Sequence, residues 1–205
     1  YYKVGPCYTK WFGMYIVSKD NGKTWGEPQR INRNLFGPIK NKPFRTDHGD
    51  LLYPTSIEDG LGWRIYMESS KQDLSDWKMC EIDNGKFNAI QPCILNHGKG
   101  KLQLLCRTKE SVIATSWSED HGKSWSKLEA TTLPNPNSGI DAVTLNHKKL
   151  HVLVYNPDKK GRKKLVMAVS KDGVHWTNVL TLEDQKVSQY SYPAVIECSD
   201  GKLFI

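Results

Sequence analysis

Arginine and tyrosine residues stand at the edges of short apolar segments of this chain. Arg107 closes the segment Leu102–Cys106, and Tyr192 stands directly before Pro193 in another such segment. A guanidinium pairs with a carboxylate or a phosphate through two parallel hydrogen bonds, and tyrosine offers a hydroxyl on an aromatic ring. These residue types suit an anionic, hydroxyl-rich ligand, on condition that the fold brings them to one place.

A turn motif with the pattern Ser-x-Asp-x-Gly-x-x-Trp recurs through the chain. Copies occupy residues 18–25 and 118–125, a shortened copy occupies 170–176, and a degenerate copy occupies 70–77. The starting positions 18, 70, 118 and 170 are 52, 48 and 52 residues apart. Repeats of about 40–50 residues with several strands each are typical of the blades of a β-propeller.

A second repeat supports the same interpretation. Short apolar segments that end in polar turns begin near residues 42, 91, 141 and 192. Further apolar segments such as Leu150–Val154 follow, and segments such as Lys164–Ser170 then lead into the Ser-Asp turns. Alternating apolar residues with hairpin residues between them predict antiparallel strands. The sequence therefore predicts an all-β fold, with one β-propeller domain over residues 1–205 and about four blades.

The topology of a propeller predicts which side chains meet. The innermost strands line the central channel, and their starting ends gather at one face with Lys42, Gln91, Asp141 and Tyr192. Residues two positions earlier lie beside them because side chains alternate with period two, which adds Lys40, Ala89, Gly139 and Tyr190. Neighbouring strands begin or end at the same face with Arg64, Arg107 and Arg162. The sequence thus predicts one cationic mouth with tyrosines in it.

Each of these residues also has a structural interpretation. Arg107 could form an ion pair within the fold, Arg162 could belong to a basic surface loop, and Tyr192 could fill the channel. Gln91 and Asp141 could hydrogen-bond neighbouring blades. Their joint convergence at one face is what favours a binding site.

Other polar residues are expected to be structural. The Asp, Ser and Gly of each Ser-Asp turn satisfy the backbone of that turn, and its Trp packs on the blade. Histidines in equivalent hairpins share a local role instead of forming a metal site: His48, His97 and His147. The cysteines are odd in number, without zinc-motif spacing: Cys7, Cys80, Cys93, Cys106 and Cys198. We therefore expect no metal or cofactor.

Composition narrows the remaining functions. The 29 Lys+Arg and 22 Asp+Glu give a net charge of +7, which favours anionic partners weakly and gives little support to nucleic-acid binding. The absence of a run of about 18 apolar residues argues against a transmembrane helix. No signal peptide is visible, and the odd cysteines favour a reducing, cytoplasmic compartment. Because the chain begins at Tyr1 and stops within an apolar segment, we expect a longer protein, of unknown oligomeric state.

The Ser-Asp turns resemble the Asp-box (BNR) repeats of sialidases, and the whole chain resembles bacterial predicted neuraminidases of that superfamily. The more specific stretches are residues 11–14, 37–43, 90–95, 133–142 and 190–194. The resemblance implies a six-bladed propeller of the sialidase type, with about two blades outside this chain. It also implies hydrolysis of a glycoside of sialic acid or of another acidic sugar.

Roles for single residues follow from the resemblance. In that family three arginines hold the substrate carboxylate, a tyrosine attacks the anomeric carbon, a glutamate assists the tyrosine, and an aspartate is acid and base. The resemblance matches Arg107 to the second arginine, Arg162 to the third and Tyr192 to the nucleophile, while the first arginine and the aspartate are expected in preceding sequence. A neutral phenol avoids the repulsion that an anionic nucleophile meets at a carbon bearing a carboxylate.

Gln91 stands at the position of the family's glutamate. An amide cannot accept the tyrosine proton, so we expect Gln91 to orient Tyr192 and take Asp141 as a candidate for a compensating acid or base. Glu58 and Glu68 are the other candidates. Substrate binding is also expected to involve Arg64, Lys42 and Tyr190. Two alternatives stay open: a lyase or hydrolase acting on uronate-containing glycans, and a glycan-binding propeller without catalysis.

Overall fold

The computed structural model describes residues 12–31, 34–145 and 148–205. Cys7, Trp11 and His147, which entered the sequence argument, lie outside the described residues. Strands, turns and loops make up the described part of the chain. No helix with the length and apolar character needed to cross a membrane occurs in these three ranges.

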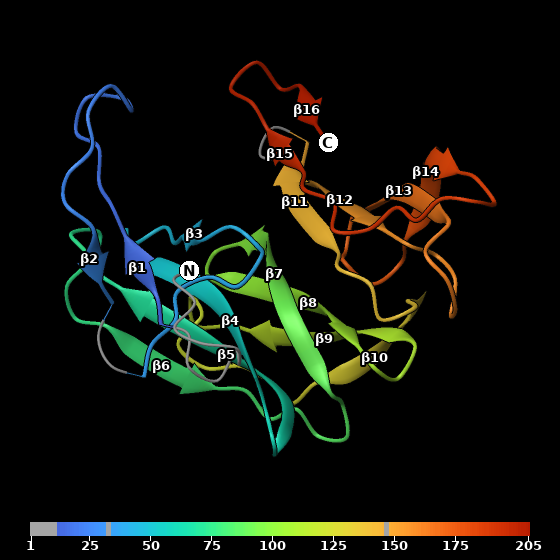
Figure 1. Ribbon diagram of the computed structural model, residues 1–205, viewed down its shortest axis with the longest axis horizontal. Helices are drawn as coiled ribbons and strands as arrows, with labels where there is room; N and C mark the ends of the chain where they lie inside the picture. Colours follow the sequence, from blue (N-terminus) through green and yellow to red (C-terminus); the bar gives the residue numbers. More distant parts are fainter. Residues whose placement is uncertain (1–11, 32–33, 146–147) are drawn as a thin grey trace.

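Three four-stranded antiparallel sheets follow one another along the chain (Figure 1). The first blade contains β3 (Phe44–Arg45), β4 (Leu51–Asp59), β5 (Gly62–Ser70) and β6 (Lys78–Glu81). The second contains β7 (Ala89–Gly98), β8 (Lys101–Thr108), β9 (Val112–Ser118) and β10 (Glu129–Pro134). The third contains β11 (Asp141–Leu145), β12 (Leu150–Tyr155), β13 (Lys164–Ser170) and β14 (Thr177–Asp184). Strand order follows the sequence in each sheet, so each blade is a meander of hairpins.

A two-stranded sheet stands at each end of this series. The first pairs β1 (Met14–Tyr15) with β2 (Gln29–Arg30), and the last pairs β15 (Ile196–Glu197) with β16 (Leu203–Phe204). The predicted all-β propeller is confirmed. The predicted count of about four blades corresponds, in the described residues, to three four-stranded blades and these two smaller sheets.

Apolar side chains fill the spaces between neighbouring blades. Leu104 and Cys106 of β8 pack in the cluster shared with the first blade, whereas Leu105 packs in the cluster shared with the third. Successive strand residues point to opposite faces, so a strand between two blades is apolar on both. Each fully buried leucine contributes about 1.5–3 kcal/mol. This packing fixes the ends of β7 and β8, where the polar residues of interest stand.

In the three four-stranded blades, the Ser-Asp turns join the third strand to the fourth. In the turn of the second blade the Ser118 hydroxyl accepts the Gly122 N–H at 2.8 Å, and Asp120 accepts the Ser124 N–H at 2.9 Å. The indole N–H of Trp125 donates to the Gly122 carbonyl at 3.1 Å. These bonds show the structural role that the sequence predicted for the turns. Strand β9 begins beside Arg107 and ends at this turn, so the turn lies at the opposite end of the blade from Arg107.

Two of the predicted innermost strands are shorter than expected. Asp141 begins β11 and Gln91 lies within β7, but Lys42 and Tyr192 stand in irregular backbone before β3 and β15. Prolines follow Lys42 and Tyr192 directly. A proline has no N–H to complete a strand ladder. Pairing starts after the proline in these two segments, whereas in β7 it begins at Ala89 and is interrupted between Ile90 and Cys93, where Pro92 lies.

Candidate functional site

Arg107 is the centre of a polar cluster at one end of the second blade. It closes β8 and is only 5% exposed. Its Nη1 donates to the Gln91 side-chain oxygen at 3.1 Å and to the Tyr192 hydroxyl at 3.0 Å. Its Nε donates to Oδ1 of Asn137 at 2.9 Å. The structure thus brings together three of the residues that the topology predicted to meet.

Gln91 and Tyr192 are held in an unusual backbone conformation. Their φ angles are 57° and 60°, a region that costs a non-glycine residue of order 1–3 kcal/mol and tends to occur at functional sites. Both precede a proline, which itself favours extended backbone at the preceding residue. At Gln91 the pairing of β7 with β8 also shifts register. The surrounding structure therefore imposes the direction of these two side chains.

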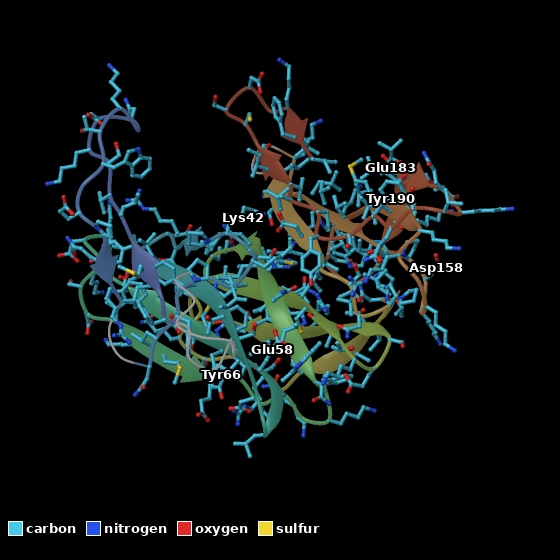
Figure 2. All side chains as sticks on the ribbon, viewed as in Figure 1. Lys42, Glu58, Tyr66, Asp158, Glu183 and Tyr190 are labelled. Atoms are coloured by element: carbon cyan, nitrogen blue, oxygen red, sulfur yellow. The ribbon has the colours of Figure 1, made fainter. Side chains whose placement is uncertain are left out.

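Arg162 and Tyr190 complete the cluster from the third blade. Arg162, in the loop between β12 and β13, donates Nη2 to the Asn137 carbonyl at 2.7 Å. Its guanidinium carbon lies 6.0 Å from the centre of the Tyr192 ring, within the range of a cation–π contact. Tyr190 contributes a backbone hydrogen bond, because its N–H donates to the Arg162 carbonyl at 2.7 Å. Tyr190 is labelled beside the third blade in Figure 2.

The electrostatics of the cluster act on the phenol of Tyr192. The hydrogen bond from Arg107 is the main reason that the pKa of Tyr192 lies below its usual value. Partial burial opposes this shift, and the charges of Arg107 and Arg162 and a hydrogen bond with Gln91 add to it. Tyr192 is 50% exposed, so a ligand can reach its ring and hydroxyl.

Asn137 and Trp63 are members of the cluster that sequence reasoning missed. Asn137, with a φ of 55°, binds one arginine through its side chain and the other through its carbonyl. The Trp63 ring lies 5.7 Å from the guanidinium of Arg107 and 4.2 Å from Nζ of Lys109. In the sequence, Asn137 was marked only by its place in the stretch 133–142. Asparagine tolerates a positive φ, which suits it to this position.

Lys42 and Asp141 form a separate pair that does not include Tyr192. The Nζ of Lys42, which is labelled in Figure 2, lies 2.7 Å from both carboxylate oxygens of Asp141, the first residue of β11. The carboxylate of Asp141, in a residue only 2% exposed, also accepts the N–H groups of Ala142 and Val195. These bonds favour the structural interpretation of Asp141, and they pair Lys42 with a carboxylate of the protein itself.

Arg64 also stands apart from the cluster. Its Nη2 donates to Asp59 at 2.6 Å within the β4–β5 hairpin, whereas its neighbour Trp63 approaches Arg107. Adjacent strand residues point to opposite faces. The structure therefore pairs Arg64 with Asp59, and in the described residues it shows no hydrogen bond of Arg64 with Arg107 or Arg162.

The other two candidate bases, Glu68 and Glu58, have neighbours other than Tyr192. Glu68 is completely buried, and its carboxylate accepts the N–H groups of Phe36 and Gly37 at 2.8 and 2.7 Å. Burial raises the pKa of Glu68 to about 7. Glu58, labelled in Figure 2, stands opposite Trp63 in the β4–β5 register. Within the described ranges, neither glutamate hydrogen-bonds Tyr192.

The family of the chain follows from its sequence and agrees with this fold. The profile of the BNR repeat-like domain matches residues 1–205, and the chain belongs to that family. The resemblance of the Ser-Asp turns to Asp-box (BNR) repeats is thereby confirmed. None of the curated proteins compared with this sequence matches it.

Solved structures with a similar fold include sialidases and trans-sialidases. NanB sialidase of Streptococcus pneumoniae superimposes with a TM-score of 0.73 over 93% of this chain at 18% identity. The intramolecular trans-sialidase of Ruminococcus gnavus, solved with oseltamivir carboxylate, gives 0.73 over 93% at 19% identity. The leech intramolecular trans-sialidase, solved with 2,7-anhydro-Neu5Ac, gives 0.70 over 93% at 18% identity. This chain spans 31%, 44% and 32% of those three chains.

Proposed function

We propose that this protein is a glycoside hydrolase of the exo-sialidase type, which releases a terminal sialic-acid-like or other acidic sugar. The observation that carries this proposal is the bond from Arg107 to the hydroxyl of Tyr192, with Arg162 close to the same ring. One place therefore offers two guanidiniums for a carboxylate and a phenol for the carbon that bears it.

The roles follow from the atoms that remain available. The described bonds of Arg107 use Nε and Nη1, so Nη2 is the atom that would pair with a substrate carboxylate, together with Arg162. Tyr192, half exposed, would bond the anomeric carbon and give a retaining mechanism through a covalent intermediate. Gln91 would orient Arg107 and Tyr192.

The test is cleavage of a fluorogenic sialoside by the full-length protein. We expect Tyr192→Phe to lose activity, whereas Tyr15→Phe should keep it, because the Tyr15 hydroxyl bonds Gln29 on exposed surface outside the site. Arg107→Met should lower kcat/KM by roughly 10²–10³-fold, with Arg45→Met, whose Nη2 bonds Gln72 on exposed surface, as matched control. Equal activity of Arg107→Met and wild type would refute the assignment.

A second candidate function is favoured by Gln91. A carboxamide accepts no proton, so the same two arginines could bind an acidic glycan without cleaving it. Saturable binding of the sialoside without any product, lost in Arg107→Met, would identify a glycan-binding propeller. Cleavage in Gln91→Glu alone would point to the same conclusion.

Uronate-containing glycans are the other substrates to compare, because a guanidinium pair suits any sugar carboxylate. A lyase would give an unsaturated product that absorbs in the near ultraviolet, and a hydrolase would give a reducing uronate. Activity on these glycans in place of the sialoside would redefine the substrate while keeping Arg107 and Arg162 in their roles.

A further inference from the structure

The hydroxyl of Tyr192 lies between the side chains of Arg107 and Gln91. Nη1 of Arg107 donates to it at 3.0 Å. The same Nη1 donates to the side-chain oxygen of Gln91 at 3.1 Å, which leaves the amide NH₂ of Gln91 as the end that can donate to the phenol. A hydroxyl that receives two donors is better satisfied as an oxyanion than as a neutral phenol.

Carboxylates are missing from these surroundings in the described residues. Asp141 is bonded to Lys42, and Glu68 to backbone N–H groups. The groups that face Tyr192 come from four elements, and all of them are cationic or neutral: Gln91 on β7, Arg107 on β8, Gly139 before β11 and Arg162 before β13. Nothing among them can take the phenolic proton.

We propose that Tyr192 works as a phenolate that Arg107 and Gln91 stabilise. At the position where the resemblance expects a proton-accepting glutamate, the amide of Gln91 instead donates a hydrogen bond to the phenolate. The catalytic role of the phenolate rests on the proposed function, whereas the ionisation of Tyr192 can be measured without a substrate. With the phenol ionised, the two guanidiniums leave one net positive charge in the cluster. That charge is still available to pair with one substrate carboxylate.

The chemical step balances without a protein base. The phenol gives its proton to solvent water before the substrate binds. The phenolate oxygen then bonds the anomeric carbon while the bond to the leaving alcohol breaks, and the departing oxygen takes a proton from water. A second water later adds to the same carbon, the phenolate leaves, and the remaining proton of that water goes to solvent.

Lowering of the Tyr192 pKa by Arg107, Arg162 and Gln91 agrees with this arrangement. The test is a pH titration of the full-length protein by the near-ultraviolet absorbance of phenolate. Subtracting the curve of Tyr192→Phe isolates one tyrosine among the 9 of the chain. We expect that difference curve to have its midpoint below that of an ordinary tyrosine.

Gln91→Glu is the decisive variant. A carboxylate beside the phenol should move the midpoint upward by on the order of one pH unit, because like charges disfavour ionisation. Gln72→Glu places the same change on exposed surface, where the amide oxygen bonds Arg45, and should leave the midpoint in place. Circular dichroism spectra of both variants verify that each one is folded.

An unchanged or lowered midpoint in folded Gln91→Glu would overturn the proposal, as would a Tyr192 that titrates like an ordinary tyrosine in the wild type. If the midpoints shift as expected but the wild type cleaves no acidic glycoside, the phenolate is supported and the hydrolase function is refuted. If cleavage occurs and the midpoints do not shift, the hydrolase stands and the phenolate is refuted.

Discussion

Lys42 and Asp141 join two blades that are separated by a third along the chain. Lys42 stands before β3 and Asp141 is the first residue of β11, and Nζ lies 2.7 Å from both carboxylate oxygens. The side chain of Asp141 is 3% exposed and that of Lys42 is 35% exposed. The pair therefore connects the first blade with the third past the innermost strand β7 of the second.

Replacement of Lys42 by methionine should destabilise the fold. Breaking a fully buried ion pair costs about 3–5 kcal/mol, and the partial exposure of Lys42 reduces the expected loss in unfolding free energy to about 2 kcal/mol. Chemical denaturation measures it. Lys71→Met removes the exposed pair with Asp50 and should change stability by less than about 1 kcal/mol; equal losses in both variants would contradict the structural role of Lys42.

Asn137→Gly should remove the hydrogen bond that positions Arg107 and keep the one that positions Arg162. Glycine keeps the positive φ and the carbonyl that binds Arg162 but removes the side chain that binds Nε of Arg107. Since small misplacement of a catalytic group can cost about 10²-fold, we expect kcat/KM to fall by about 10–100-fold. Asn137→Ala also lacks the side-chain amide and adds backbone strain, so it should be less stable than Asn137→Gly. Kinetics like those of the wild type in Asn137→Gly would refute this positioning role.

Gly139→Ala should displace the ring of Tyr192. A Cβ at residue 139 would lie 3.0 Å from Cδ1 of Tyr192, closer than a relaxed carbon–carbon contact, whereas Oε1 of Gln91 would lie at an ordinary contact distance of 3.5 Å. Turnover should fall, with little change in melting temperature because the ring can swing toward solvent. Gly60→Ala is the matched control, since nothing lies within 4 Å of its Cβ, and it should leave turnover unchanged.

Glu68 should make stability depend on pH. Its pKa is raised by burial from 4.5 to about 7, so between these values the folded state holds a proton that the unfolded state has released. Unfolding free energy should therefore fall as pH rises through this window, by about 3 kcal/mol in total. The measurement is the difference between wild type and Glu68→Gln at several pH values, with Glu58→Gln as the control for losing one carboxylate from the first blade. A pH-independent difference would contradict this account.

The blades could be predicted from the sequence because their signals are local. Each Ser-Asp turn bonds its own backbone, so the motif at 118–125 identifies a turn wherever it occurs. The meeting of Arg107 with Gln91 and Tyr192 was also predictable, because strand ends of successive blades gather at one face. Tertiary packing was not needed for either inference.

Side-chain direction within the mouth could not be predicted. Repeat alignment treats Lys42, Gln91, Asp141 and Tyr192 as equivalent. A positive φ turns Gln91 and Tyr192 toward Arg107, whereas Lys42 and Asp141 lack it and bond each other. The shift of register between β7 and β8 has no sequence signal beyond Pro92. Backbone angles that depend on neighbouring blades thus decide which residues form the site.

The cluster draws its members from successive blades: Gln91 and Arg107 from the second, Arg162 from the third and Tyr192 from the segment that leads to β15. A ligand that pairs with both arginines therefore binds only while these blades remain docked. Such a ligand raises the free energy of their separation by RT ln(1 + [L]/Kd). Local unfolding of the third blade should accordingly become rarer as an acidic sugar saturates the site. Hydrogen exchange of the backbone amides of β12 and β13 measures this unfolding.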